Sequence, residues 1–147
     1  MAPTPIILVV EDNPDDADLA LLAFHDSRLE NEIVLARDGV EALDYLFARG
    51  DYAGRDTAVL PHVVLLDLKL PKMDGLEVLR RIRADNRTSL LPVVMLTSSD
   101  EEADIAQSYG LGTNSYIRKP VDFTEFNDAV TTMGQYWLGL NRGPTAP

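Results

Sequence analysis

The chain has 147 residues, a length typical of one domain, and hydrophobic residues make up 46% of it, which is enough to bury a core. Its net charge of −11 and its lack of any lysine- or arginine-rich stretch argue against binding to nucleic acid or an anionic membrane. The absence of cysteine excludes disulfides, zinc–thiolate sites and thiol catalysis, and two histidines are too few for a multi-histidine metal site. No signal peptide or membrane span is evident, so we expect a soluble, cytoplasmic protein.

Five short apolar runs predict β-strands along the chain. Three of the first four are apolar throughout, which is typical of a parallel sheet that is buried on both faces. The last run is shorter and more polar, as an edge strand would be. The predicted strands are residues 6–10, 33–36, 63–66, 93–96 and 115–117.

Amphipathic helical patterns lie between and after these runs, so strands and helices alternate. Their apolar stripes are Ala17, Ala20, Leu21 and Phe24; Val40, Leu43 and Phe47; Val78, Leu79 and Ile82; Ile105 and Tyr109; and Phe126, Val130, Met133 and Trp137. Asn13 followed by Pro14 predicts the first helix start, and Asp38, Asp74, Ser99 and Asp122 predict the others, each with a glutamate three residues later. This alternation predicts a (βα)5 α/β domain with right-handed crossovers.

The domain organisation follows from the same pattern. We expect one domain over residues 1–147, with a core over about 5–138, a flexible tail over 139–147 and no output domain. Residues 49–61 form a connection longer than usual for an α/β domain. It is either an insertion without a role or a contact surface, and the sequence favours neither.

Polar residues follow four of the five predicted strands. Glu11 and Asp12 follow the first, Asp67 the third, Thr97 the fourth and Lys119 the fifth. In open parallel sheets, ligands bind outside the carboxyl ends of the strands. If the strand order is 2-1-3-4-5, strands one and three are neighbours and their acids converge. Each of these residues alone has an ordinary structural explanation, such as a helix cap or a surface lysine, but their joint position indicates a site.

Converging carboxylates need compensation. Two unit charges about 4 Å apart at an effective dielectric near 20 repel by roughly 4 kcal/mol. The single positive charge of Lys119 is insufficient against three negative charges, and a hard divalent cation with oxygen ligands would restore the balance. Mg²⁺ fits, and it pairs naturally with phosphate. A carboxylate nucleophile could then become an aspartyl-phosphate, with the metal, the Thr97 hydroxyl and the Lys119 ammonium stabilising the transferred group.

Four motifs in this order resemble the receiver domain of two-component response regulators: VVEDN, LLDLKLPKMDG, VVMLTSSD and SYIRKP. The resemblance covers about residues 5 to 138. It implies a flavodoxin-like, doubly wound, five-stranded parallel sheet of order 2-1-3-4-5 with helices on both faces. It also implies a stand-alone phosphoprotein that is a signalling switch rather than an enzyme, catalysing only its own phosphorylation from a histidine kinase and its autodephosphorylation.

The resemblance also implies residue roles. Asp67 resembles the phosphoacceptor, and Glu11, Asp12, Asp67 and the backbone carbonyl of Lys69 the ligands of Mg²⁺, for which Mn²⁺ can substitute. Thr97 and Tyr116 resemble the switch residues and Lys119 the phosphoryl-binding lysine, and the Lys119–Pro120 bond would be cis. Glu11 stands where aspartate is commoner. Lys69 and Ser99 flank the path of the attacking water, which leaves the rate of dephosphorylation open.

The expected output is a surface change. Phosphorylation would draw Thr97 inward, Tyr116 would follow, and the face made by the fourth helix, fifth strand and fifth helix would change. Ile105 and Tyr109 would hold the fourth helix only lightly. Trp137 either covers the core or belongs to a partner surface, and we expect a homodimer through the C-terminal side.

A narrower resemblance concerns the kinase. The segments VEDNPDDADL and RDGVEALDYL, the GDYAGRD insertion and a last helix ending near YWL are similar to stand-alone regulators paired with phytochrome-type kinases. It implies a sensor histidine kinase of the bacteriophytochrome type as the partner.

Three rival functions fit the sequence less well. A haloacid-dehalogenase-like phosphohydrolase would need an acid at the position of Lys69 and room for a cap domain. A flavodoxin-like cofactor module would need a phosphate-binding first loop, whereas EDNPDD would repel phosphate. A degenerate receiver would lack key residues, and all of them are present.

Overall fold

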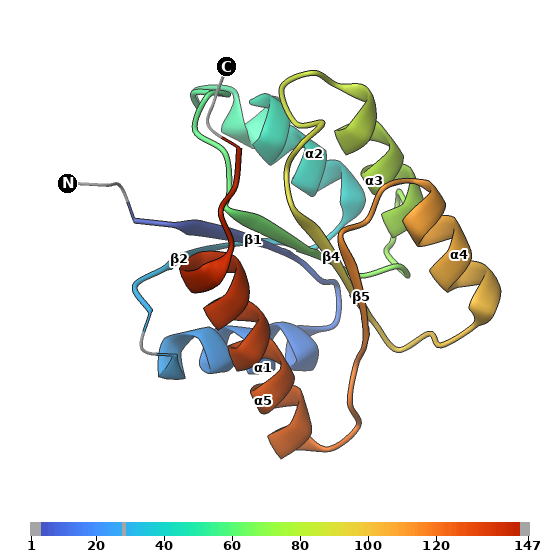
Figure 1. The fold of residues 1–147 in the computed structure, drawn as a ribbon. Helices are drawn as coiled ribbons and strands as arrows, with labels where there is room; N and C mark the ends of the chain where they lie inside the picture. Colours follow the sequence, from blue (N-terminus) through green and yellow to red (C-terminus); the bar gives the residue numbers. More distant parts are fainter. Residues whose placement is uncertain (1–3, 28, 145–147) are drawn as a thin grey trace.

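A five-stranded parallel sheet of order β2-β1-β3-β4-β5 forms the centre of the computed structural model, which describes residues 4–27 and 29–144 (Figure 1). The predicted fold class and strand order are therefore confirmed. Each strand lies within one residue of its predicted bounds: β1 (Ile6–Val10), β2 (Glu32–Ala36), β3 (Val63–Leu66), β4 (Val93–Thr97) and β5 (Ser115–Arg118).

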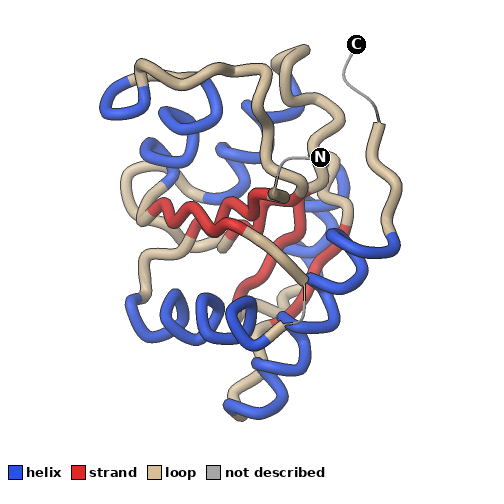
Figure 2. The backbone as a smooth tube through the Cα atoms, turned by 90° about the vertical axis from the view of Figure 1, so that its left-hand side faces the viewer, coloured by secondary structure: helices blue, strands red, loops and turns tan. Residues whose placement is uncertain are grey.

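Helices cover both faces of this sheet, and Figure 2 shows them on either side of the strands. α1 (Pro14–Asp26) and α5 (Phe123–Gly134) pack together on one face, and α5 continues as a π-helical segment, η2 (Gln135–Leu140). α2 (Gly39–Phe47) and α3 (Gly75–Ala84) cover the other face, and α4 (Glu102–Gly110) lies beside α3. Within the described residues, no helix combines the length and the apolar character that crossing a membrane requires.

Two separate cores result from the alternation of side chains along the strands. Val64 and Leu66 of β3 point toward α2 and α3, while Val63 and Leu65 point toward α1 and α5. All four are at most 2% exposed, as the continuous apolar run predicts for a strand buried on both faces. Trp137 packs against the core on the α1 and α5 side.

Four of the five predicted helix starts are confirmed by side-chain hydrogen bonds. Asn13 accepts from the backbone N–H groups of the first turn of α1, and Asp38, Asp74 and Asp122 each accept from the glutamate N–H three residues later. The start at Ser99 is wrong. α4 begins at Glu102, because the Ser99 hydroxyl donates to the Asp104 carboxylate (2.6 Å) instead of capping the helix.

Two predicted apolar anchors are also wrong. Val40 of α2 is 39% exposed and Tyr109 of α4 is 52% exposed, so neither side chain is buried in a core. Ser108 is the one buried residue of α4. This helix is therefore held to the domain by little apolar surface, as its thin stripe predicts.

The long connection at 49–61 is fastened to α2. It begins with a 3₁₀ turn, η1 (Gly50–Tyr52), and the Arg55 guanidinium lies 3.7 Å from the centre of the Tyr45 ring. Arg55 also donates to the Val59 carbonyl (2.6 Å). At the other end of the chain, helical structure runs to Leu140. The flexible tail predicted over 139–147 therefore overlaps η2, and its last residues, 145–147, lie outside the described residues.

Replacing Gly75 should be costly, because this glycine begins α3 directly against the strand end that carries Asp67. A Cβ at position 75 would lie 2.2 Å from the Asp67 carbonyl oxygen. We expect Gly75→Ala to lower the free energy of unfolding by about 3 kcal/mol, as overpacking against fixed backbone does. Urea unfolding measures the change. Gly54→Ala is the control, since its Cβ would meet no atom within 4 Å. Equal stability of the two variants would contradict the expectation.

Candidate functional site

Glu11 and Asp67 lie side by side because the strands that precede them are paired. Val10 of β1 is in register with Leu66 of β3, and the Asp67 N–H donates to the Val10 carbonyl (3.1 Å). Both carboxylates are buried, at 5% and 6% exposure. Asp12 is exposed, but its carboxylate still lies with the other two: one oxygen from each of the three falls within 4.8 Å of the others.

Lys119 brings the site together. Its Nζ lies 2.6 Å from Glu11 Oε2, 2.9 Å from Asp16 Oδ2 and 3.0 Å from Asp67 Oδ2, and its side chain is 9% exposed. The Lys119 N–H donates to the Thr97 carbonyl (2.7 Å), which holds the start of this loop beside the end of β4. The end of the fifth strand thus lies where the sequence predicts, against the acids of strands one and three.

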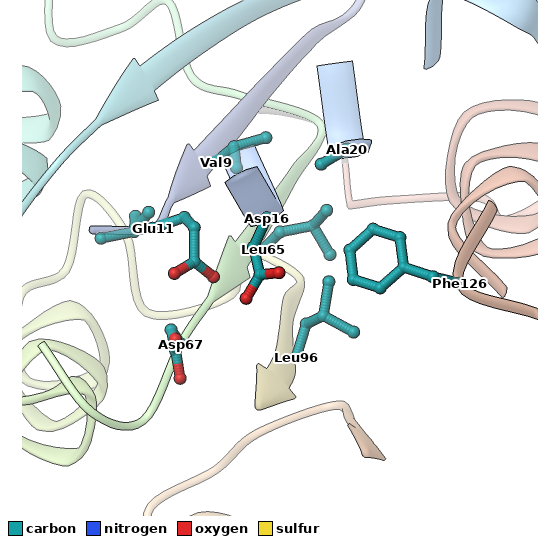
Figure 3. A pocket seen from close by; sticks show the side chains of 9 residues that line it. Val9, Glu11, Asp16, Ala20, Leu65, Asp67, Leu96 and Phe126 are labelled. Carbon is teal, nitrogen blue, oxygen red and sulfur yellow. The ribbon is translucent and has the colours of Figure 1, made fainter. Parts of the chain in front are cut away.

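Asp16 is a member of the site that the sequence did not predict. An acid in the first turn of a helix already has an ordinary role, because it interacts favourably with the helix dipole. Figure 3 shows its carboxylate turned toward the same space as those of Glu11 and Asp67. It lies in the first turn of a helix that begins three residues after Glu11, and that turn faces the strand ends. The available signal was the proximity of this turn to the acidic pair.

Burial and neighbouring charges shift the pKa values of two of these groups, Glu11 and Lys119. Burial raises the pKa of Glu11 to about 7, although its hydrogen bond with Lys119 opposes the shift. Burial alone would lower the pKa of Lys119, but hydrogen bonds to Asp16 and Glu11 outweigh it and hold that pKa above its usual value. The ammonium therefore stays charged. Counting Glu11, Asp12, Asp16 and Asp67 against Lys119, four acids surround one cation.

A small cavity separates this charged cluster from the apolar core on the α1 and α5 side (Figure 3). Its volume is about 10 Å³, room for about one water molecule. The carboxylates form one wall and apolar side chains the rest. The lining residues are Val9, Val10, Glu11, Asp16, Ala20, Leu65, Asp67, Leu96 and Phe126.

Thr97 and Tyr116 lie next to the cluster. Thr97 ends β4 fully buried, and its Oγ1 is within 3.5 Å of the Ser99 N–H. The Tyr116 hydroxyl donates to the Ser99 carbonyl (2.8 Å). Both predicted switch residues therefore contact Ser99, in the loop between β4 and α4. Within the described residues, neither forms a hydrogen bond to an acid of the cluster.

The remaining predicted positions are Lys69 and Pro120. The Lys69 N–H donates to Asp67 Oδ1 (3.2 Å), so the loop after β3 folds back over the acid. The predicted cis Lys119–Pro120 bond is wrong: none of the described peptide bonds is cis. Trans is the favoured form by about 0.5–1 kcal/mol for a bond before proline, and Lys119 reaches all three carboxylates with the bond trans.

The donor set fits a hard divalent cation. Carboxylate oxygens are what Mg²⁺ and Mn²⁺ take in proteins, and Mg²⁺ is usually bound through one or two carboxylates and several waters. Glu11, Asp12 and Asp67 converge closely enough to share an ion, and Asp12 leaves the cluster open to solvent on one side. The excess of acids over the single ammonium gives such an ion a favourable field.

A cluster of this kind at the strand ends of a doubly wound sheet is that of a phosphoacceptor signalling domain. The family model of the response regulator receiver domain matches residues 7–131, and the chain belongs to this family.

Three proteins show how similar this chain is to known response regulators. The probable methanogenesis regulatory protein FilR2 of Methanothrix harundinacea is 44% identical over 95% of this chain and 87% of its own. Response regulator Rcp1 of Synechocystis is 35% identical over 98% and 96%, and the crystal structure of its Mn²⁺-bound form matches with a TM-score of 0.89, 34% identity and coverage of 96% and 99%. The structure of the phosphorylated cyanobacterial phytochrome response regulator RcpA matches with a TM-score of 0.90, 39% identity and coverage of 97% and 100%.

Removing the ammonium should destabilise the metal-free protein. In Lys119→Met, Glu11 and Asp67 stay buried without a counter-charge, and breaking a buried ion pair costs about 3–5 kcal/mol. Urea unfolding with EDTA measures the loss. Arg118→Gln is the matched control, because Arg118 pairs with Asp100 at the surface, where such pairs contribute about 0–1 kcal/mol. A Lys119→Met protein as stable as the control would show that the ammonium does not hold the site.

Proposed function

We propose that Asp67 accepts a phosphoryl group from the phosphohistidine of a sensor histidine kinase. The observation that carries this proposal is the contact of its buried carboxylate with Lys119 Nζ (3.0 Å), beside Glu11 and Asp12. The carboxylate has one oxygen near the ammonium and the other near the Lys69 N–H. Both contacts orient it at the open end of the strands.

The transfer exchanges one bond for another. An oxygen of Asp67 forms a bond to phosphorus while the phosphorus–nitrogen bond of the donor breaks, and the histidine nitrogen keeps the electron pair and takes up a proton. Lys119 and the Thr97 hydroxyl stabilise the equatorial oxygens. Mg²⁺, or Mn²⁺ in its place, when held by Glu11, Asp12, Asp67 and the Lys69 carbonyl, supplies further neutralisation of charge. Water later attacks phosphorus, the bond between the Asp67 oxygen and phosphorus breaks, and inorganic phosphate leaves, which returns the carboxylate. The protein thus limits its own signal.

The proposed kinase is a phytochrome-type sensor, which this chain would meet in the cytoplasm. Support comes from similarity to RcpA, a phytochrome response regulator, over 97% of this chain. Rcp1 and FilR2 are matched over 96% and 87% of their own lengths. We therefore propose that the receiver over about residues 5–138 is the working unit, acting as a switch or a phosphate relay.

The proposed output is a change at the face made by α4, β5 and α5. Thr97 and Tyr116 both contact Ser99, whose hydroxyl is bonded to Asp104 of α4. Movement of Thr97 toward a phosphoryl group would therefore disturb the contacts that hold the first turn of α4. The coupling is wrong if a Thr97→Ala variant keeps phosphorylation-dependent binding to its partner.

The proposed assembly is a homodimer through the C-terminal side. Phe123 of α5 and Tyr136 and Leu140 of η2 are exposed and apolar. Sedimentation equilibrium tests this proposal, because a monomer at all accessible concentrations would refute it.

The first expected outcome is one phosphoryl group on Asp67. Intact-protein mass spectrometry after incubation with acetyl phosphate and Mg²⁺ should show one added group on the wild type. We expect no added group on Asp67→Asn, because the nucleophile is gone, or on wild type with EDTA.

Asp56→Asn is the control, since Asp56 is an exposed acid in the 49–61 connection and its loss should leave the labelling intact. A short-lived adduct is distinguished from none by adding beryllofluoride, which should raise the melting temperature of wild type and not of Asp67→Asn. If neither donor nor mimic acts, the proposal is wrong.

The second expected outcome concerns the metal. Mg²⁺ should stabilise the wild type by about 1.4 kcal/mol for each tenfold rise in concentration above its Kd. Asp12→Asn should lose this effect because it removes one of three converging oxygens. Asp15→Asn removes the same charge from the first turn of α1 and should keep it. Thermal melts across a Mg²⁺ series measure both, and equal responses would rule out Asp12 as a ligand.

A further inference from the structure

A second concave site lies at the ends of α2 and α3. It has a volume of about 320 Å³, and three guanidinium groups from three different segments line it. We call it the basic groove. Its lining residues are Phe47, Arg49, Arg81, Ala84, Asp85 and Arg87.

Phe47 holds two of these guanidiniums in position. The Arg49 Cζ lies 5.4 Å and the Arg87 Cζ 4.8 Å from the centre of its ring, both within the range of a cation–π contact. The arginine side chains remain about half exposed. The guanidiniums are thus held in position before a ligand binds and are still accessible to it. Fewer side-chain rotamers are therefore lost on binding, which lowers its entropic cost.

Most of the guanidinium N–H groups have no protein acceptor among the described residues. Arg81 uses its Nε alone, on Glu77 (2.8 Å), and both terminal nitrogens are free. Arg87 uses Nε and Nη2 on Asp85 and keeps Nη1. The Arg49 guanidinium donates no hydrogen bond, since the carboxylate with which it pairs, that of Asp44, is 3.8 Å away. Each arginine can therefore donate further hydrogen bonds to an anion.

The groove contrasts with the rest of the chain. It gathers three of 13 basic residues in a chain of net charge −11, and one acid lines it. It also lies far from Asp67. α2 and α3 begin at the strand ends, and the groove sits at their last residues, nine and ten residues on, which is roughly 13–15 Å of helix. A ligand here would leave the phosphoacceptor accessible.

The lining selects among anions. The groove is far larger than one carboxylate or phosphate needs. The Phe47 ring is already contacted by two guanidiniums, so it is a poor platform for stacking a nucleobase. Three separated planar cations instead suit several carboxylates on an extended chain, each bound by a guanidinium fork.

We propose that the basic groove binds an acidic segment of a partner protein, at the pole opposite the phosphorylation site. The segment presents at least two carboxylates to Arg49, Arg81 and Arg87. Binding there is independent of phosphorylation. It gives a protein that repels acidic partners over most of its surface one place where such a partner can dock.

The test uses the full chain and a fluorescein-labelled octaglutamate peptide as the probe, followed by fluorescence anisotropy. We expect saturable binding that weakens as salt is raised, and at least a tenfold weaker affinity for Arg81→Gln/Arg87→Gln. Arg37→Gln/Arg142→Gln is the matched control, because it removes the same charge from exposed positions outside the groove. It should change the affinity less than twofold. Amide NMR shifts on titration should include Phe47 and Ala84.

Three outcomes would overturn the proposal. The first is that octaglutamate does not bind the wild type at all, and the second is that both double variants weaken its binding equally. The third is that ATP, as a nucleotide probe, binds the groove at concentrations at which octaglutamate does not. Self-association lost only in the groove variant would identify a second copy as the occupant and overturn it too. Labelling of Asp67 by acetyl phosphate should be equal in all of these proteins, so a failure here is distinct from a failure of the phosphoacceptor assignment.

Discussion

The contact of one lysine ammonium with three carboxylates holds the functional end of this domain together. Lys119 follows β5, Glu11 follows β1, Asp67 follows β3 and Asp16 belongs to α1, so four separate segments meet at a single nitrogen. Without that nitrogen the acids would repel and the loops would separate. With it, the cluster is compact but still short of positive charge. The same arrangement therefore stabilises the apo fold and leaves an attraction for a divalent cation.

The charge cluster is also connected to α4, which has fewer buried residues than the other α-helices. Lys119 is bonded through its backbone to Thr97, and Thr97 and Tyr116 both contact Ser99. Ser99 in turn bonds to Asp104 of α4, a helix with one buried residue. A change of charge at Asp67 thus has a short route of bonded groups to a segment with little packing to resist movement. In the proposed function, this weak packing is what would let α4 transmit the signal.

Much of this arrangement could be predicted from the sequence, because its determinants are local. Apolar runs set the strands, and an asparagine or aspartate with free backbone N–H groups after it set four helix starts. The polar residues at strand ends then indicated the site, since parallel strands end at one edge. Asp16 escaped because a helical acid has an adequate local role, and only the packing of α1 shows that it reaches Lys119.

The other errors arose from competition between partners that a sequence does not rank. The Ser99 hydroxyl could cap a helix or donate to Asp104, and the structure shows the second contact. Tyr109 has the spacing of a core residue, but its side chain is 52% exposed. The cis bond before Pro120 was inferred from resemblance rather than from any physical requirement, and Lys119 contacts its three carboxylates with the bond trans.

The two cores described above have a consequence for how this protein can change over generations. The sheet acts as a partition, with neighbouring residues of β3 serving opposite sides. Substitutions under α2 and α3 share no packing partners with those under α1 and α5, so their costs should add rather than compound. Substitutions can then accumulate on one face of the sheet, or create a new binding surface there, independently of the other face. The cluster of Glu11, Asp16, Asp67 and Lys119 at the strand ends borders both faces, so substitutions there are the ones that this independence does not cover.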